Sequence, residues 1–162
     1  MKYIRKELYN FQEEVKVLPT VCLSYIADSH FPSFNADSIQ IASTLKALRK
    51  EGAEVELMAL KNPEKDSNGM VDTNAKLNRI IPLKGFLYWF GIWSLITNLF
   101  KKRQIIYSRH LFSAVLHTRF GFETYYEMHN DYWNSTPIPR SWIEKSFNKM
   151  KGFVSISRGL QK

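Results

Sequence analysis

From residue 20 onward, short β-prone segments alternate with longer helix-forming segments, and no other feature of the sequence constrains the fold as strongly. Compact apolar or alternating runs predict strands at residues 20–27, 54–60, 104–108, 124–128 and 153–157. Helical patterns fall between them, at residues 37–51, 85–100, 111–120 and 139–150. Strands that alternate with helices are typical of βαβ units, whose right-handed crossovers place helices on both faces of a parallel sheet. The sequence therefore predicts a Rossmann-like, doubly wound α/β fold in a single domain.

Turn-forming and capping residues set the expected boundaries of the first elements. Asp37 or Ser38 is predicted to cap the first helix, and Gly52 stands where that helix would end in the left-handed conformation. Residues 28–35 contain a proline and several small polar residues, which predicts a loop. The polar residues 61–76 are expected to form a second, longer loop.

The composition fits one globular domain with a substantial core. The chain has 162 residues, of which 44% are hydrophobic and 23% are charged. Residues 1–19 are expected to be an N-terminal extension, and residues 20–162 to be the domain proper. The single cysteine, Cys22, cannot form an intrachain disulfide, which favours a reducing compartment and a cytoplasmic location.

The net charge is +8, which suits an anionic partner. A phosphorylated small molecule, an acidic membrane surface and nucleic acid all meet this description. The basic residues are scattered, and no nucleic-acid-binding module is recognisable, so nucleic acid is not an expected partner.

The segment 85–100 is the most apolar part of the sequence, and two interpretations of it remain open. It is shorter than the about 20 apolar residues that a membrane-spanning helix requires. Because it is apolar nearly all round, the first interpretation is a core helix. It is also rich in aromatic residues and is followed by Lys101, Lys102 and Arg103. A helix that lies on an anionic membrane has this composition, so the second interpretation is peripheral contact with the inner face of the membrane through residues 86–103.

Ligands of a doubly wound sheet bind outside the carboxyl ends of its strands. This rule selects three loops, at residues 28–38, 108–112 and 129–135. Neither the GxGxxG dinucleotide signature nor the GxxxxGK[ST] P-loop is present, so a standard dinucleotide or P-loop site is not expected. The helix that follows residues 28–38 begins with free backbone amides, which suit an anion.

Three side chains near these loops are candidates for chemistry. His129 lies just past a predicted strand end, and Glu127 points to the same side if the strand continues that far. A histidine in this place can accept a proton or bind a sugar hydroxyl, and an ordinary loop histidine is the alternative. Arg109 can bind a phosphate or carboxylate as a planar fork, or it is a solvated charge. The spacing of His110, His129 and Asp131 gives no support to a metal site.

Four segments carry a more specific pattern: Val21–Asn35 with the helix up to Val55, Gln104–Arg109, Tyr126–His129 and Phe153–Leu160. In this order and spacing they resemble the N-terminal domain of glycosyltransferase family 4 enzymes, which have two Rossmann-like domains in the GT-B arrangement. Tyr107-Ser108-Arg109 is similar to the family's Tyr-Thr-Arg strand end, and Glu127-Met128-His129 to its Glu-x-His strand end. The resemblance covers residues 20–162 and implies that the chain is half of a GT-B fold.

The resemblance also implies roles for individual residues. His129 falls on the family's histidine near the transferred sugar and is the expected catalytic residue. The implied substrate-binding residues are Asp28, Ser33, Asn35, Ala36, Arg109 and Glu127. Many relatives have two glycines where this chain has Asn35 and Ala36.

The implied function is the acceptor-side domain of a retaining glycosyltransferase, which transfers a sugar from a nucleotide-sugar donor to a glycan or lipid-linked acceptor. The nucleotide-sugar is a substrate, and neither a cofactor nor a metal is expected. The donor-binding C-terminal domain is expected to be missing from these residues, so the chain alone should lack turnover, because a GT-B site needs both of its walls. The alternative is a non-catalytic Rossmann-like module that binds a partner protein or a phosphorylated ligand.

Overall fold

The computed structural model describes residues 21–33, 35–61, 76–80, 86–101, 104–128 and 136–155. The strands are β1 (Cys22–Phe31), β2 (Glu54–Lys61), β3 (Lys76–Ile80), β4 (Ile105–Ser108), β5 (Thr124–Met128) and β6 (Gly152–Ser155). The helices are α1 (Ala36–Lys50), α2 (Phe86–Leu99), α3 (Leu111–Arg119) and α4 (Arg140–Phe147). The expected helix within residues 1–19 lies outside the described residues, as do residues 62–75 of the expected long loop.

The described strands form one parallel sheet in the order β3-β2-β1-β4-β5-β6. This is the strand order of a doubly wound Rossmann fold, so the predicted fold class is confirmed. Strand β1 lies in the middle, where Leu23 is opposite Val55 of β2 on one side and Ile105 of β4 on the other. The order of the strands therefore reverses between β1 and β4, and this is the topological switch point of the sheet.

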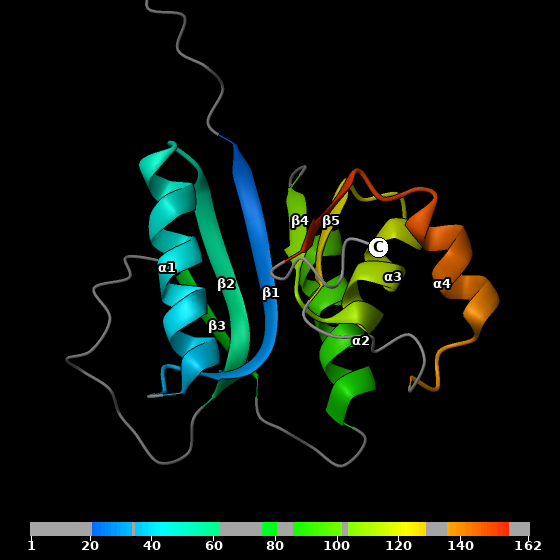
Figure 1. Cartoon of the computed structure of the whole chain (residues 1–162), viewed down its shortest axis with the longest axis horizontal. Coiled ribbons are helices and arrows are strands. Elements are labelled where there is room, and N and C mark those ends of the chain that lie inside the picture. Colours follow the sequence, from blue (N-terminus) through cyan, green and yellow to red (C-terminus); the bar gives the residue numbers. More distant parts are fainter. Residues whose placement is uncertain are drawn as a thin grey trace, which may run out of the picture.

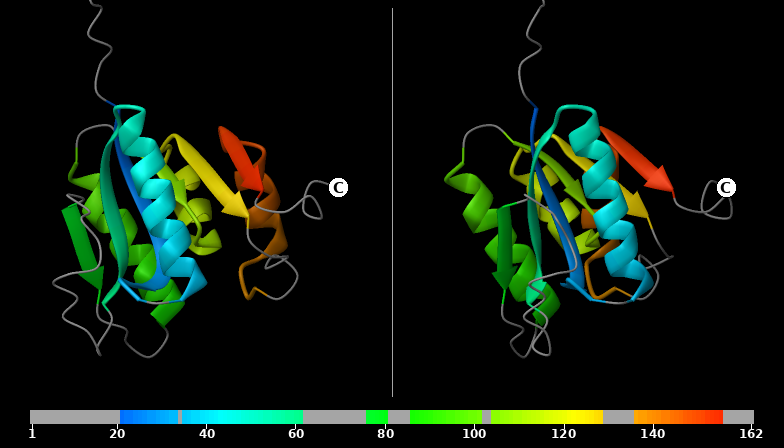
Figure 2. Two further views of the ribbon diagram at one scale, coloured as in Figure 1. Left: turned by 60° about the vertical axis from the view of Figure 1, so that its left-hand side comes forward. Right: turned by 90° about the vertical axis from the view of Figure 1, so that its left-hand side faces the viewer.

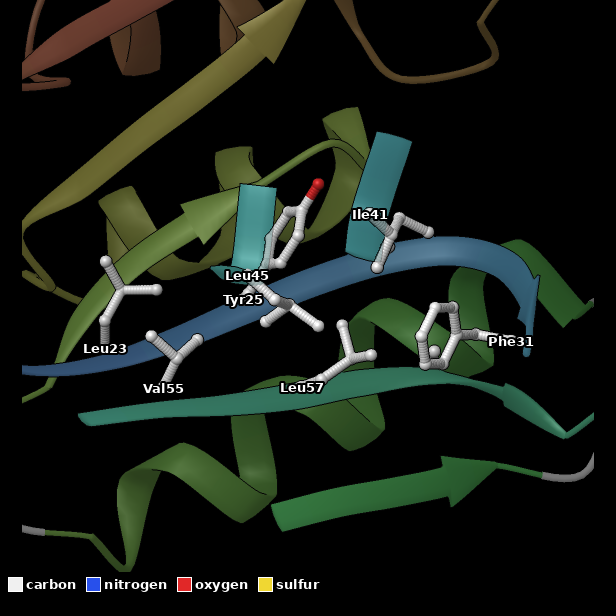
Figure 3. Packing of buried hydrophobic residues seen from close by; sticks show 9 residues of the cluster. Leu23, Tyr25, Phe31, Ile41, Leu45, Val55 and Leu57 are labelled. Atoms are coloured by element: carbon white, nitrogen blue, oxygen red, sulfur yellow. The ribbon is translucent and has the colours of Figure 1, made fainter. Parts of the chain in front are cut away.

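Helices cover both faces of the sheet, with α1 on one side and α2, α3 and α4 on the other (Figure 1; Figure 2). On the first face, Ile41 and Leu45 of α1 are fully buried against side chains of β1 and β2, as Figure 3 shows. On the second face, Phe90 of α2 packs with Ile26 of β1 and Ile106 of β4. Alternate residues of the central strands thus enter two separate cores, which explains why these strands are apolar on both sides.

The first helix begins at Ala36, and its cap is Asn35, so the prediction of Asp37 or Ser38 as the cap is wrong. Asn35 has an extended backbone, and its Oδ1 accepts a hydrogen bond from the backbone amide of Ser38 at 2.9 Å. This is the usual geometry of an asparagine cap. The prediction for Gly52 is confirmed, because its φ is +84° just after the helix.

The predicted loop at residues 28–35 is wrong in its first part, because β1 continues to Phe31. The pairing of β1 with β2 shifts between Ile26 and His30 and then resumes. The side chain of Phe31 is buried in the core beneath α1. Strand β1 is therefore longer than β4, and its last residues project beyond the end of that neighbour.

The sequence patterns predict no strand at β3, which the structure places at the edge of the sheet beside β2. Strand β3 has only five residues and is partly polar, so its sequence shows neither an apolar run nor a clear alternation of apolar and polar residues. An edge strand needs a partner on one side only, and that pairing uses the backbone. For this reason its sequence signal is weak.

Helix α4 is shorter than the predicted 139–150. Helix α4 begins at Arg140 and ends at Phe147, and Pro139 is its cap rather than part of its first turn. Strand β6 begins at Gly152, one residue earlier than predicted.

The helix predicted at residues 85–100 is confirmed, but the expectation that it is a core helix is wrong for one of its faces. Phe90 and Leu95 of α2 are buried, whereas Trp89 and Trp93 are 50% and 47% exposed. Helix α2 packs closely on α3 at Gly91, where an added Cβ would lie 2.5 Å from the ring of Phe112. The helix is thus buried on one side only.

Candidate functional site

The carboxyl ends of β1, β4 and β5 meet at one edge of the sheet. The strand register places Ile26, Ser108 and Tyr126 in one row across these strands. Arg109, the first residue after β4, donates its backbone amide to the carbonyl of Ile26 at 2.9 Å. Glu127 follows Tyr126 within β5. This edge is also the switch point between β1 and β4, where doubly wound proteins bind ligands.

Glu127 is an acidic side chain that is almost completely buried at this edge, with 1% of its surface exposed. Gln40 of α1 donates a hydrogen bond to Oε1 at 3.1 Å, and the hydroxyl of Tyr25 donates to Oε2 at 3.4 Å. Tyr107 of β4 hydrogen-bonds to the same carboxylate. A buried carboxylate needs several hydrogen-bond partners, because burying a charge without partners costs much free energy.

Arg109 joins this carboxylate to the start of α1. Its guanidinium lies 3.7 Å from Glu127 Oε1 and 3.2 Å from Asp37 Oδ1, and it also donates to the backbone carbonyl of Asp37 at 3.4 Å. The side chains of Arg109 and Glu127 are 5% and 2% exposed, so their pair is shielded from water, whereas the side chain of Asp37 is 55% exposed and its pair with Arg109 is open to solvent on one side. We call this group the rim cluster; its members are Tyr25, Asp37, Gln40, Tyr107, Arg109 and Glu127.

The two tyrosines of the rim cluster are held in the neutral form. Burial is the main cause that raises the pKa of Tyr25, and the negative charge of Glu127 raises it further. The pKa of Tyr107 is raised by burial first and then by Glu127. Their rings also pack together, with centroids 5.1 Å apart. Both hydroxyls therefore keep their protons and act as donors to the carboxylate.

The start of α1 adjoins the rest of the rim cluster, and three of the predicted site residues, Ser33, Asn35 and Ala36, lie just before the helix or at its first position. The side chain of Asn35 caps the helix, and the backbone amide of Ser33 donates to the hydroxyl of Ser38 at 2.8 Å. Ala36 is exposed at the first position of the helix. Asp37 in the first turn of α1 is favoured by the helix dipole and is paired with Arg109. An anionic ligand would therefore compete with Asp37 for Arg109.

The structure brings most of the predicted site residues to this edge. Asp28 lies in the part of β1 that extends beyond its pairing with β4. Arg109 and Glu127 each follow a residue of the row formed by Ile26, Ser108 and Tyr126. The remaining three, Ser33, Asn35 and Ala36, lie just before α1 or at its start. His129 lies outside the described residues, one position after Met128, the last residue of β5. Sequence reasoning missed Tyr25, Gln40 and Tyr107 as partners of Glu127. The available signal was the presence of tyrosines in strands that are otherwise apolar.

His110, which follows Arg109, is buried near the same edge. Its Nδ1 lies 2.8 Å from the hydroxyl of Ser113, and its ring packs against Phe90. Burial lowers the pKa of His110, and the charge of Asp28 partly opposes this effect. The imidazole is thus neutral and connects the start of α3 to the core beneath α2.

His117 of α3 is fully buried where α3 packs against α2. Its Nδ1 lies 2.8 Å from the carbonyl of Ser113, so Nδ1 carries the proton and donates. Its Nε2 then accepts from the amide of Asn98 at 3.0 Å. Burial lowers the pKa of His117 to about 4.

This pKa predicts a loss of stability in mild acid. The pKa falls from 6.5 in the unfolded chain to about 4 in the folded one, so the unfolded chain binds more protons between these values and stability falls as the pH is lowered through this window. We expect the protein to lose about 3 kcal/mol more than a His117→Gln variant between about pH 7 and pH 4. Urea unfolding at several pH values measures this difference. An equal pH dependence in the two proteins would contradict the prediction.

A separate hollow of about 480 Å³ lies at the opposite edge of the sheet, near the amino ends of β4 and β5. Its lining includes Leu99, Phe120 and Phe122, together with Lys101, which is ion-paired with Glu56. Neither the rim cluster nor a predicted site residue contributes to it. Within the ranges that the structure describes, no group of three or more His, Cys, Asp or Glu side chains could hold a metal ion.

No protein-family model matches the chain, and a search of curated proteins finds no match. The fold and the geometry of the carboxyl edge are therefore the observations on which a function can be argued.

Proposed function

We propose that this domain is the acceptor-side half of a retaining glycosyltransferase with the GT-B architecture, which transfers a sugar from a nucleotide-sugar donor to a glycan or lipid-linked acceptor. One observation carries the proposal. Arg109 and Glu127, which belong to two of the segments that resemble glycosyltransferase family 4, come together with the start of α1 at the switch point of a Rossmann sheet. In doubly wound proteins this is the place where ligands bind.

The rim cluster would serve this function by holding the walls of the site in place. Arg109 and Glu127 are buried and already paired, so they are suited to positioning rather than to direct contact with a substrate. Their pairing fixes the end of β5, after which His129 follows in the sequence. It also fixes the first turn of α1 through Asp37. Precise placement of such loops is what brings two substrates into a reactive arrangement.

The exposed and half-buried residues at the same edge would then meet the substrate. Asp28 and Asn35 offer a carboxylate and an amide, which are suited to the hydroxyl groups of a sugar. In the proposed role His129 lies near the transferred sugar. The second Rossmann-like wall, which binds the nucleotide, would come from a further domain or chain, so we expect no turnover from these 162 residues alone.

Acceptor binding can be tested on the isolated chain by amide chemical shifts in NMR. The probe is N-acetylglucosamine linked through pyrophosphate to a short, water-soluble prenyl chain. We expect shifts at the amides around Asn35 and Arg109. An Asp28→Asn variant should bind about tenfold more weakly, because it loses a charged hydrogen bond worth about 1.5 kcal/mol. The matched control is Glu144→Gln, which removes a carboxylate of similar size from the exposed face of α4.

Four outcomes would contradict the proposal. Shifts confined to the opposite edge of the sheet, or no shifts at all, would remove the acceptor site. Shifts produced by inorganic phosphate but not by the glycolipid would favour the alternative, a non-catalytic module that binds a phosphorylated ligand. Product formed from a nucleotide-sugar by the isolated chain would refute the need for a second wall.

A further inference from the structure

The polarity of α2 is the reverse of that expected for a surface helix. Its inward side carries Ser94 and Asn98, which are 0% and 1% exposed. Its outward side, including the residue that follows the helix, consists of large apolar and aromatic side chains that are 39% to 87% exposed: Tyr88, Trp89, Ile92, Trp93, Ile96, Leu99 and Phe100. We call this set the α2 outer face. An ordinary surface helix turns its polar side to water.

Hydrogen bonds on the inward side fix this orientation. The hydroxyl of Ser94 donates to the carbonyl of Gly91 at 2.8 Å and lies 3.3 Å from the hydroxyl of Ser113 in α3. Asn98 donates to His117 of α3 at 3.0 Å. Rotating the helix to hide its aromatic residues would leave these buried polar groups without partners and would also expose Phe90 and Leu95, which are buried in the observed orientation. The α2 outer face is therefore a permanent feature of the fold.

The α2 outer face is too large to be the scattered exposure of single apolar residues. Its seven side chains lie along the whole described length of the helix, at the spacing of one helical face. Contiguous apolar surfaces of this kind mark the contact with another molecule or with a membrane.

The charges around the helix indicate what that neighbour is. The sequence has no charged residue from 86 to 100, whereas Lys84 precedes this segment and Lys102 and Arg103 follow it, after Lys101, which is ion-paired with Glu56. Two copies of the chain paired through α2 would bring these basic ends together in either orientation, and like charges repel. An anionic neighbour would instead attract both ends of the helix.

We infer that the α2 outer face lies on the surface of an anionic lipid bilayer. The residues suit this position, because tryptophan and tyrosine prefer the boundary between lipid and water and flanking basic residues bind acidic headgroups. The helix has 14 residues, which gives a length of about 21 Å against the about 30 Å of a bilayer core. No helix in the described ranges meets the length and apolar character needed to cross a membrane. The helix therefore lies along the surface.

Flotation with lipid vesicles tests this inference without reference to the proposed enzymatic role. We expect the chain to float with vesicles of phosphatidylcholine and phosphatidylglycerol, to float much less with phosphatidylcholine alone, and to detach as the salt concentration rises. A double variant, Trp89→Ser with Trp93→Ser, should lower the partition coefficient by about tenfold or more. The matched control is Trp142→Ser, because Trp142 is an exposed tryptophan on α4, 39% exposed, outside the α2 outer face.

Tryptophan fluorescence gives a second readout of the same contact. In a background of Trp133→Phe and Trp142→Phe, only Trp89 and Trp93 remain of the four tryptophans. Their emission should shift to the blue on addition of anionic vesicles, and brominated lipids should quench it. A second pair of substitutions, Ile92→Ser with Ile96→Ser, should also release the protein, which guards against a folding defect in the first pair.

The inference is overturned if the wild-type chain fails to float with anionic vesicles. It is also overturned if the Trp142→Ser control loses as much binding as the double variant. A dimer in sedimentation analysis that dissociates on substitution of Trp89 and Trp93, with no vesicle binding, would assign the α2 outer face to a second copy of the chain instead.

Discussion

Replacing Arg109 with alanine is expected to lower the free energy of unfolding by about 3–5 kcal/mol, because a buried charge then loses its partner. The guanidinium is the cation that faces Glu127 in the described part of the chain, at 3.7 Å, and the carboxylate is 1% exposed. Urea unfolding followed by circular dichroism measures the change.

Two further variants separate this effect from simple loss of packing. A double variant, Arg109→Met with Glu127→Gln, removes both charges and keeps an acceptor for Tyr25, so it should lose less stability than Arg109→Ala. Arg140→Ala breaks a pair with Glu144 whose members are 89% and 62% exposed. That exposed pair should contribute no more than about 0.5 kcal/mol. If Arg109→Ala proves as mild as Arg140→Ala, the rim cluster does not hold the edge of the sheet.

The second large effect is expected at Phe90, whose replacement by alanine should cost about 3–5 kcal/mol. Phe90 is fully buried and packs with Ile26, Leu60 and Ile106, and its ring meets His110. It is the contact through which α2 enters the core of the second face. Thermal or urea unfolding reports the loss.

Trp93→Ala is the informative control for Phe90→Ala, because Trp93 is a larger aromatic residue on the same helix, one turn away. Its side chain is 47% exposed on the α2 outer face. In the absence of membranes, its loss should change stability by only about 0.5 kcal/mol. Similar losses at the two positions would mean that α2 is buried on both sides.

The fold class could be predicted because parallel strands that are buried on both faces leave a strong signal. Runs such as residues 54–60 are apolar or alternate clearly, and the helices between them have ordinary caps and stops. The edge strand β3 and the extension of β1 to Phe31 could not be predicted. Both depend on pairing with β2, and the residues involved are polar or are typical of turns.

The orientation of α2 could not be predicted either, for a different reason. A segment that is apolar nearly all round contains no periodic signal, so its sequence does not say which side faces the core. The polar residues Ser94 and Asn98 mark the inward side, but only because α3 offers them partners.

At the candidate site, the sequence identified Arg109 and Glu127 but not their pairing. Each is found at the end of a predicted strand, and the resemblance to glycosyltransferases assigns both to one site. Their contact depends on the register that places Ser108 beside Tyr126, which no local pattern encodes. A second register, between β1 and β4, places Tyr25 beside Tyr107 and so brings the two tyrosines together.

The position of β1 in the middle of the sheet has a consequence for how the chain is made. Its partner β2 follows soon after it, but its other partner, β4, is separated from it by β2, β3 and α2. As the chain leaves the ribosome, the backbone edge of β1 that pairs with β4 has no hydrogen-bonding partner until β4 has been synthesised. Self-association of nascent chains along that open side is the hazard to expect, and slower translation before residue 105 would prolong it.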